Sequence, residues 1–274
     1  MERQFKIGVI GVGFVGNAIT ESLKMKGLVA VGYDKFKDGG IGSFEEVIKN
    51  DILFLCLPTV YKNELKEYDK SIIYEVCQQL VDVSYSGIVV IKSTVEIGTT
   101  NYLLEKYPLK YIHNPEFLTA RTAIYDFHHQ EHIVLGVSSK VSLEELTHFK
   151  SFYEIYYFNT PISVCTTNES EAMKISCNSF YATKVQFFNE IYAICGKMDI
   201  SYNAVKDLML KNKWINPMHC DVPGSDGALS FSGACLPKDL SALNEHMNRL
   251  NTPHAVINAA LKERNTMRHD NVNC

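Results

Sequence analysis

The chain has 274 residues, of which 46% are hydrophobic and 21% are charged, so it is long enough to bury a sizeable core and to form two folding units. Its formal net charge of -4, with no block of Lys and Arg residues, excludes the electrostatic footprint of a nucleic-acid or anionic-membrane binder and favours a small-molecule partner. No apolar run approaches the roughly 18 residues of a membrane span, and the N-terminus lacks the layout of a signal peptide, so we expect a cytoplasmic protein.

The first predicted strand (FKIGVI) runs directly into GVGFVG, which places Gly11, Gly13 and Gly16 in GxGxxG spacing at a strand-to-helix junction. Glycine at these positions allows a tight turn, close approach of the backbone to a pyrophosphate and close contact between helix and strand. The helix predicted to follow starts at Phe14 and Val15 and directs its unbonded N–H groups at the phosphates. The stretch therefore predicts a dinucleotide-binding loop.

A second predicted strand (LVAVGYD) ends in Asp34. A carboxylate at this point accepts hydrogen bonds from both ribose hydroxyls and repels a 2′-phosphate, so the sequence predicts NAD rather than NADP as the cofactor. Lys35 follows directly and softens this discrimination. The other interpretation is a glycine-rich turn with an incidental aspartate.

Further apolar runs alternate with helical stretches. We expect strands in DILFLCLP, GIVVIKST, KYIHNPEF and HIVLGV, at residues 51–58, 87–94, 110–117 and 132–137. Such continuous runs are typical of a parallel sheet covered on both faces, and ligands bind beyond the carboxyl ends of its strands. Because those ends carry Thr59, Thr94 and the Asn114-Pro115-Glu116 turn, we expect a cleft that collects two hydroxyls and a carboxylate.

The stretch DFHHQEH contains His128, His129 and His132 and raises the interpretation of a zinc site. It leads into the strand predicted at 132–137, where alternation would send neighbouring side chains to opposite faces. We therefore expect a surface approach to the strand and no metal.

The pattern changes after residue 165, and a long helix is predicted over residues 169–198. We therefore expect residues 1–165 to form an NAD-binding domain and residues 166–274 a second, helical domain. Lys174 and Asn178 lie four residues apart and share one face of the long helix, where they could hold a developing oxyanion. A solvated polar face is the alternative.

The stretch FSGACLPKD places Cys235 directly before a predicted helix, with Pro237 among its first residues. A helix N-terminus and the nearby charge of Lys238 favour a thiolate, and the small residues before the cysteine leave room for a substrate carbonyl. The eight cysteines lack CxxC pairing, which indicates reduced thiols, and only this one combines these features. A small buried hydrophobe is the alternative.

Together these motifs resemble the nucleotide-sugar 6-dehydrogenases, the UDP-glucose and GDP-mannose dehydrogenases. The resemblance is carried, in order, by GVIGVGFVG, KSTVEIGTT, HNPEFL, the Lys174/Asn178 helix with its downstream NE, and VPGSDG followed by CLPKD. It implies a Rossmann-type doubly wound parallel sheet followed by a mostly helical central domain. It also implies an NAD-dependent four-electron oxidation of the C6 alcohol of a nucleotide sugar, with UDP-glucose as the expected substrate.

The resemblance also implies roles for the candidate residues. Lys174 and Asn178 hold the oxyanion and position the substrate, and Cys235 forms a thiohemiacetal and then a thioester. Asp239 and Thr94 handle water, and Glu116 assists thioester hydrolysis. The predicted cofactor-binding set is Gly11, Gly13, Phe14, Val15, Gly16, Asp34, Lys35, Thr59, Thr94 and Lys238.

The chain departs from the family pattern at three places. Ala120 and Arg121 stand where the family has a second glutamate, which leaves Glu116 as the sole nearby carboxylate and gives Arg121 a possible contact with a sugar or phosphate. Ser230 and Ser232 replace two glycines before the cysteine, at a cost wherever the loop needs a positive φ. The family's third, nucleotide-binding domain is missing after a helix predicted at about 253–269.

The missing domain leaves three interpretations: a separately encoded partner chain, a minimal enzyme that uses dimer contacts, or a protein without turnover. By family analogy we expect a homodimer built on the helices at 169–198 and about 253–269. Two other functions stay open. One is a two-electron dehydrogenase of the β-hydroxyacid type, which does not need Cys235, and the other is a non-catalytic NAD-binding subunit.

Overall fold

A computed structural model describes residues 5–268 of the chain. The chain divides into two compact units, which comprise residues 1–59 with 69–174 (unit 1) and residues 60–68 with 175–274 (unit 2). Helix α7 (Thr167–Lys197) begins in unit 1 and continues into unit 2. The assignment of two domains that meet at 165/166 stays a prediction.

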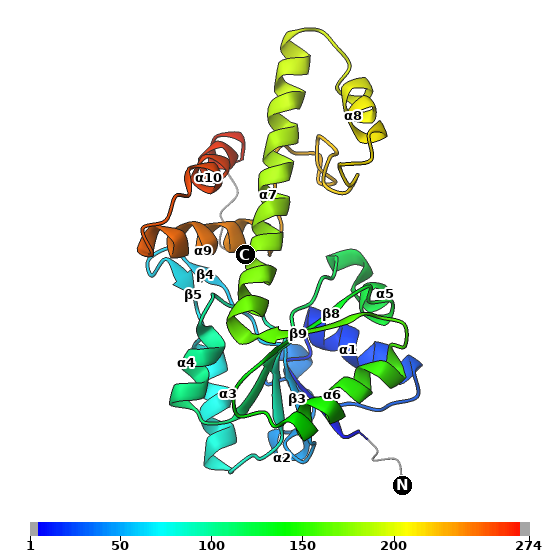
Figure 1. The fold of residues 1–274 in the computed structure, drawn as a ribbon, viewed down its shortest axis with the longest axis vertical. Coiled ribbons are helices and arrows are strands. Elements are labelled where there is room, and N and C mark those ends of the chain that lie inside the picture. The colour runs from blue at the N-terminus through cyan, green and yellow to red at the C-terminus, as the bar shows by residue number, and fades with distance from the viewer. Residues whose placement is uncertain (1–4, 269–274) are drawn as a thin grey trace. The chain divides into compact units, whose positions relative to one another are not determined.

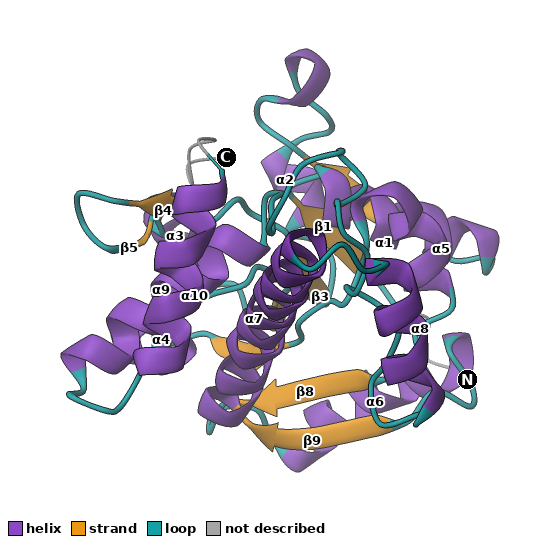
Figure 2. Ribbon diagram, turned by 90° about the horizontal axis from the view of Figure 1, so that it is seen from above, coloured by secondary structure: helices purple, strands orange, loops and turns teal. Residues whose placement is uncertain are grey.

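Unit 1 is built on a seven-stranded sheet in the order β2-β1-β3-β6-β7-β8-β9 (Figure 1). Its strands are β1 (Ile7–Ile10), β2 (Val31–Tyr33), β3 (Ile52–Leu55), β6 (Ile88–Ile91), β7 (Lys110–His113), β8 (Ile133–Val137) and β9 (Ile162–Thr166). The first six were all predicted. The sequence missed β9, which pairs with β8 at the edge of the sheet and is only partly buried (Figure 2).

The expectation of a wholly parallel sheet is wrong at one pair, because β7 and β8 run antiparallel. The other neighbouring strands of this sheet are parallel. A buried strand has the same apolar pattern whether it runs parallel or antiparallel to its neighbour, so the sequence could not predict the orientation of β8. The Rossmann-type class itself is confirmed.

Helices cover both faces of the sheet because successive side chains of each strand point to opposite sides. In β3, Ile52 and Phe54 face one core, whereas Leu53 and Leu55 face the other. The first core is completed by α1 (Phe14–Met25), α5 (Ala123–His128) and α6 (Leu143–Tyr156). The second is completed by α2 (Phe44–Val47), α3 (Ser71–Asp82) and α4 (Thr99–Lys106). Because helices cover both faces, the loops that follow the strands lie together at the carboxyl edge of the sheet.

Unit 2 is mostly helical, as predicted. Besides its part of α7, it contains the hairpin of β4 (Tyr61–Lys62) and β5 (Glu67–Tyr68), and the helices α8 (Tyr202–Lys211), α9 (Leu236–Arg249) and α10 (Ala255–Met267). Two small cores join these helices to α7, one around Phe188 and Tyr202 and one around Phe231 and Leu240. Within residues 5–268, no helix combines the length and the apolar character needed to cross a bilayer.

Candidate active site

The glycine-rich loop between β1 and α1 leaves room for a ligand. A Cβ on Gly11, which has φ +89°, would lie 2.4 Å from the carbonyl oxygen of Cys56, and a Cβ on Gly16 would lie 1.9 Å from the carbonyl oxygen of Gly11. Gly13 differs, because a Cβ there would meet no atom within 4 Å. This open space adjoins the first turn of α1, which has no side-chain cap and no acidic residue. Both features suit a pyrophosphate.

Asp34 follows β2, and backbone groups hold its carboxylate. Its Oδ2 accepts a hydrogen bond from the N–H of Val12 at 2.8 Å, and its Oδ1 accepts from the N–H groups of Phe36 and Lys37 at 3.0 Å each. Burial raises the pKa of Asp34, but the hydrogen bonds from Lys37, Phe36 and Val12 outweigh burial and lower the pKa overall. Asp34 is therefore kept in the ionised form that accepts hydrogen bonds from ribose hydroxyls.

A cavity of about 710 Å³ extends over these loops within unit 1. The predicted cofactor residues that line it are Gly11, Gly13, Phe14, Val15, Asp34 and Lys35. The sequence missed the opposite wall, formed by α3 and the residues after β6: Ile72, Glu75, Val76, Gln79, Lys92 and Ser93. The α3 residues follow a helical stripe, which in the sequence looks the same as a core-facing stripe.

Thr59 and Thr94 follow the carboxyl ends of β3 and β6. The hydroxyl of Thr59 donates to the backbone oxygen of Thr94 at 2.8 Å. Beside it, Ser93 Oγ donates to the carbonyl of Leu57 at 2.7 Å and accepts from the N–H of Leu57 at 2.9 Å. These bonds join the two loops, so the hydroxyl of Thr94 is carried on a fixed backbone next to the cavity wall.

Glu116 and Lys174, two predicted catalytic residues, are brought together in unit 1. Lys174 Nζ donates to the backbone oxygen of Glu116 at 2.5 Å and lies 3.3 Å from its Oε1. The N–H of Leu118 donates to Glu116 Oε2 at 2.7 Å. Lys174 is buried, so the alternative of a solvated polar face is wrong for this residue.

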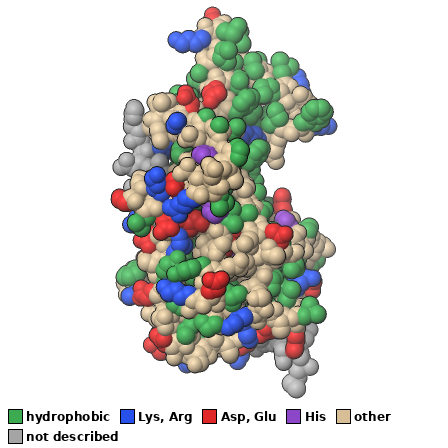
Figure 3. Space-filling model, turned by 60° about the vertical axis from the view of Figure 1, so that its left-hand side comes forward, with side chains coloured by type: hydrophobic (Ala, Val, Ile, Leu, Met, Phe, Trp, Pro, Cys, Tyr) green, Lys and Arg blue, Asp and Glu red, His purple; other side chains and the backbone are tan. Residues whose placement is uncertain are grey.

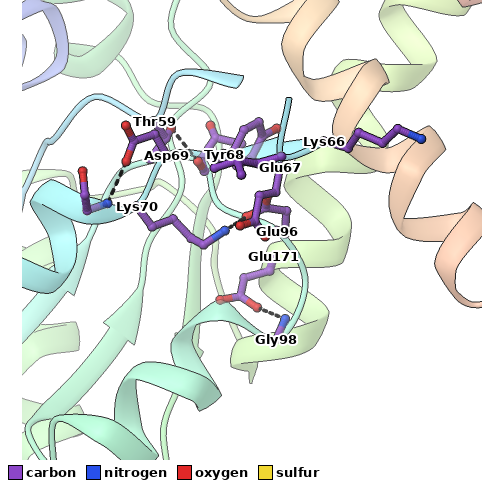
Figure 4. A network of polar contacts seen from close by, with 12 residues as sticks. Thr59, Lys66, Glu67, Tyr68, Asp69, Lys70, Glu96, Gly98 and Glu171 are labelled. Atoms are coloured by element: carbon purple, nitrogen blue, oxygen red, sulfur yellow. Dashed lines mark hydrogen bonds and ion pairs between the residues drawn. The ribbon is translucent and has the colours of Figure 1, made fainter. Parts of the chain in front are cut away.

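Glu171 ties the start of α7 to the loop that carries Thr94. This fully buried carboxylate accepts hydrogen bonds from the N–H of Gly98 at 2.6 Å, and from the N–H and hydroxyl of Thr100 at 2.7 and 2.6 Å (Figure 4). Burial raises the pKa of Glu171 to about 7, against the lowering effect of these bonds. Lys70 and Glu96 form an ion pair of 2.9 Å close by (Figure 4). The sequence analysis missed this anchor.

In unit 2, the fully buried Asp239 collects three donors. The hydroxyl of Tyr68 and the amide of Asn178 each lie 2.5 Å from its carboxylate oxygens, and Lys238 Nζ lies at 2.6 Å. Lys238 also lies over the ring of Tyr68, 4.3 Å from its centre. Asn178 is buried, so the solvated alternative is wrong here too. Tyr68 carried no sequence signal.

Cys235 is the N-cap residue of α9, and Pro237 lies in the first turn, as predicted. The side chain of Cys235 is exposed, which contradicts the alternative of a small buried hydrophobe. Asp239 lies four residues further along, and residues at this spacing share one face of a helix. An accessible thiol therefore stands at the positive end of the helix dipole, with a buried carboxylate one turn away.

The two serines before Cys235 behave differently. Ser230 has φ +60°, in the left-handed region that favours glycine. Its N–H donates to Asn189 Oδ1 at 2.8 Å, and its hydroxyl donates to Gln186 Oε1 at 2.6 Å. The predicted cost of a positive φ therefore applies to Ser230, and two hydrogen bonds to α7 offset it. Ser232 has no positive φ and donates to Asp226 Oδ2 at 3.0 Å.

Helix α10 also holds this loop. The buried Arg264 donates through Nε to the carbonyl of Phe231 at 3.3 Å. Arg268 donates to the carbonyl of Leu229 at 3.0 Å and pairs with Asp226 at 2.7 Å. The hydrogen bond from Arg268 is the main reason why the pKa of Asp226 is strongly lowered. The loop before the cysteine is thus fixed by residues from both α7 and α10.

The three neighbouring histidines have separate partners. His128 and His129 lie at the end of α5, so the first part of this stretch is helical, and the exposed Glu131 and His132 lead from it into β8. His128 Nδ1 is 3.2 Å from Ser22 Oγ, and His132 Nε2 is 2.8 Å from Ser163 Oγ. Across the described part of the chain, no three His, Cys, Asp or Glu side chains are grouped as a metal site.

Arg121 lines a second hollow, of about 810 Å³, together with Gly13 and Phe14 of the glycine-rich loop. It lies in a 3₁₀ turn over residues 120–122. Its contact with a phosphate or sugar stays a prediction. A further hollow of about 610 Å³ begins at Ile52 and Ile88, at the amino ends of β3 and β6, and so belongs to the opposite edge of the sheet.

Comparison with known proteins matches this chain to two domains of one protein family. The UDP-glucose/GDP-mannose dehydrogenase family, NAD binding domain, matches residues 42–156, and the central domain of the same family matches residues 168–266. The UDP-glucose 6-dehydrogenase YwqF of Bacillus subtilis is 28% identical over 78% of this chain and 48% of its own length. The chain therefore spans about half the length of this curated relative. NAD is the cofactor that the first of these domains binds.

Two solved structures share the fold. A UDP-glucose dehydrogenase from Pyrobaculum islandicum is similar over 97% of this chain and 69% of its own, with a TM-score of 0.81 and 21% identity. A 3-hydroxyisobutyrate dehydrogenase from Mycobacterium tuberculosis is similar over 94% of this chain and 92% of its own, with a TM-score of 0.70 and 18% identity. At these identities the likeness concerns the fold alone.

Proposed function

Because the chain belongs to the UDP-glucose/GDP-mannose dehydrogenase family, we propose that it oxidises the C6 alcohol of a nucleotide sugar to a carboxylate, with reduction of two NAD molecules. UDP-glucose is the substrate we propose, supported by the name of its Bacillus subtilis relative. The reaction removes four electrons, and NAD, when bound, accepts a hydride in each of the two steps.

In the first step, the C6 hydroxyl loses its proton and C6 loses a hydride, which gives the aldehyde. We propose that Lys174 and Asn178 stabilise the negative charge that develops on the oxygen. Lys174 is suited to this role because its ammonium group is buried and held against Glu116. Asn178 donates one amide hydrogen to Asp239, and its NH₂ group has a second hydrogen for the substrate.

In the second step, Sγ of Cys235 adds to the aldehyde carbon, and the oxygen takes up a proton to complete a thiohemiacetal. This addition is needed because an aldehyde has to become tetrahedral before it can lose a second hydride. Loss of that hydride from C6, together with loss of the proton from the hydroxyl, leaves a thioester. Water then displaces the thiolate and gives the carboxylate. We propose that Asp239 and Thr94 position this water and that Glu116 takes its proton.

The observation that carries the proposal is the exposed thiol of Cys235 at the start of α9, one turn from the buried Asp239. The test is to measure the NADH formed per sugar consumed over a panel of UDP- and GDP-sugars. We expect two NADH per sugar, and no carboxylate from the Cys235→Ser variant. Cys165→Ser, at a partly buried cysteine in β9, is the matched control and should keep its activity.

Two other functions make different predictions in the same assay. A two-electron dehydrogenase of the β-hydroxyacid type is suggested by the fold shared with the 3-hydroxyisobutyrate dehydrogenase. It would form one NADH per substrate and keep full activity in Cys235→Ser, which would contradict our proposal. A non-catalytic NAD-binding subunit would bind NAD and reduce none of it with any sugar of the panel.

We also propose that unit 2 pairs with a second copy of the chain. Hydrophobic side chains gather at the end of unit 2 that carries α8 and the C-terminal half of α7 (Figure 3). The large exposed apolar residues there include Phe187, Ile194, Met198, Leu208 and Trp214. Apolar surface of this extent marks an interface. Sedimentation should detect a dimer that Ile194→Glu dissociates, whereas a separately encoded partner would leave the purified chain monomeric.

A further inference from the structure

Lys92 is a buried charged residue that the proposed reaction does not yet use. It directly follows β6, and only 1% of its surface is exposed. Its Nζ donates to Oδ1 of Asn114 at 3.1 Å and to the carbonyl oxygen of Pro115 at 3.3 Å. Moving an ammonium group out of water has a large desolvation free energy, and hydrogen bonds to uncharged amide oxygens offset only part of it. The sequence therefore places a charge here at the expense of stability.

The ammonium group of Lys92 holds the same turn that Lys174 holds. Lys92 bonds the carbonyl of Pro115, and Lys174 bonds the next carbonyl, that of Glu116. Asn114 is fixed in turn, since its amide donates to the carbonyl of Val134 at 2.8 Å. Two consecutive peptide carbonyls of the turn that presents Glu116 are therefore each bound by a buried cation.

The strand order places Lys92 at the nicotinamide end of the cofactor cavity. Asp34, suited to the adenosine ribose, follows β2, and the glycine-rich loop follows β1. Lys92 follows β6, which lies on the opposite side of β1 from β2. Because both Asp34 and Lys92 line the cavity, a dinucleotide bound at Asp34 directs its other end toward Lys92.

Two ionisable groups near Lys92 are uncharged at neutral pH, whereas Lys92 itself keeps its charge. Burial raises the pKa of Cys56 to about 12 and lowers that of His113 to about 3, so both of these are neutral. Burial also lowers the pKa of Lys92, to about 8, which leaves it mostly protonated at pH 7. Lys174 Nζ lies 3.3 Å from Oε1 of Glu116, and Lys92 Nζ binds the carbonyl oxygen of the residue before Glu116.

We propose that Lys92 is a positioning residue of the oxidation site: its buried ammonium group fixes the Asn114–Glu116 turn and adds a positive charge at the nicotinamide end of the cavity. A fixed positive charge there favours the neutral ring of NADH over the cationic ring of NAD⁺. The proposal rests on the function proposed above for its kinetic consequences, but its effect on cofactor binding is independent of the sugar substrate.

The test uses Lys92→Met, which keeps an unbranched side chain and removes the charge. We expect kcat to fall about tenfold or more, because Glu116 loses its fixed position. The affinity for NAD⁺ relative to NADH, measured without sugar, should rise about threefold or more.

The matched control is Lys110→Met, at the first residue of β7, where the ammonium group binds Glu145 at 2.5 Å, far along the strand from the Glu116 turn. This variant should leave the NAD⁺/NADH affinity ratio unchanged. If Lys92→Met does not fold, Lys92→Gln removes the charge and keeps an N–H donor on a side chain that is one atom shorter.

The outcomes separate this proposal from the proposed function. If the wild-type protein oxidises no nucleotide sugar, the function fails, and the NAD⁺/NADH affinity ratio still decides the role of Lys92. A Lys92→Met variant that loses rate or melting temperature while keeping the wild-type NAD⁺/NADH affinity ratio would overturn the proposal. In that case Lys92 has a purely structural role.

Discussion

The sheet edge of unit 1 and the cysteine loop of unit 2 hold their functional groups in opposite ways. At the sheet edge, Lys92, Lys174 and Glu171 are buried, and each is bound to groups on neighbouring loops. In unit 2, Cys235 is exposed at the end of a loop, and the fixing contacts are made by the residues before it.

This difference follows from the chemistry that each region is proposed to perform. A charge that stabilises another charge acts most strongly when it is fixed and away from water. A nucleophile has to reach a carbon atom of the substrate, so it needs access. Asp239 is a buried, fixed charge next to an accessible nucleophile, because it lies on the helix that begins at Cys235 and is itself fully buried.

Asp239→Asn should have the largest effect, because it removes a buried charge one turn from the exposed thiol. Tyr68, Asn178 and Lys238 all donate to this carboxylate, and the variant removes the negative charge that pairs with the ammonium group of Lys238. We expect a loss of about 3 kcal/mol in the free energy of unfolding, measured in urea, and of about a thousandfold in kcat. Asp207→Asn, at an exposed site in α8, should change stability by less than about 0.5 kcal/mol.

Lys174→Met should be next in size and tests whether the buried charges of unit 1 act on the substrate. We expect kcat to fall about a hundredfold while the dissociation constant of NAD changes less than about threefold. Steady-state kinetics and fluorescence titration measure the two quantities. The control is Lys150→Met, at a more exposed lysine that pairs with Glu154 on α6. An unchanged kcat in Lys174→Met would mean that burial at the sheet edge serves stability alone.

Glu171→Gln removes a titrating group at the sheet edge, so a comparison of this variant with wild type should show how Glu171 makes the stability depend on pH. The pKa of Glu171 is raised by burial from an ordinary 4.5 to about 7, so its contribution to stability is fully present below pH 4.5 and is lost as pH rises through 7. We expect wild type to lose up to about 3 kcal/mol relative to Glu171→Gln between pH 5 and pH 8. Urea unfolding over this range measures the difference, and a constant difference would contradict the assignment.

Variants of Ser230 should have the smallest effects, and they separate strain from hydrogen bonding in the cysteine loop. Ser230→Ala keeps the positive φ and leaves Gln186 without its donor, so we expect a loss of about 1 to 2 kcal/mol. Ser230→Gly loses the same bond but relieves the backbone, so it should be about 1 kcal/mol more stable than Ser230→Ala. Thermal unfolding of the pair tests this order, and equal stabilities would show that the left-handed backbone carries no strain.

The sequence by itself determined the class of the fold and several of the residues that line the cavity of unit 1. The spacing of the glycines and of Asp34 follows from local backbone geometry, and the apolar strands show as short apolar runs. Both features can be recognised from neighbouring residues in the sequence. The same holds for Cys235, because a proline in the first turn marks a helix start.

Only the tertiary structure decided which charges are buried and which groups they bind. The antiparallel pairing of β7 with β8, the contact between Glu171 and α4, and the three donors on Asp239 all join residues far apart in the chain. Lys92 carries no signal in the sequence, and the sequence left open whether Lys174 lies on a solvated face, since burial depends on what packs around a side chain. The physical reason is that local geometry is set by neighbouring residues, whereas desolvation and charge pairing are set by distant ones.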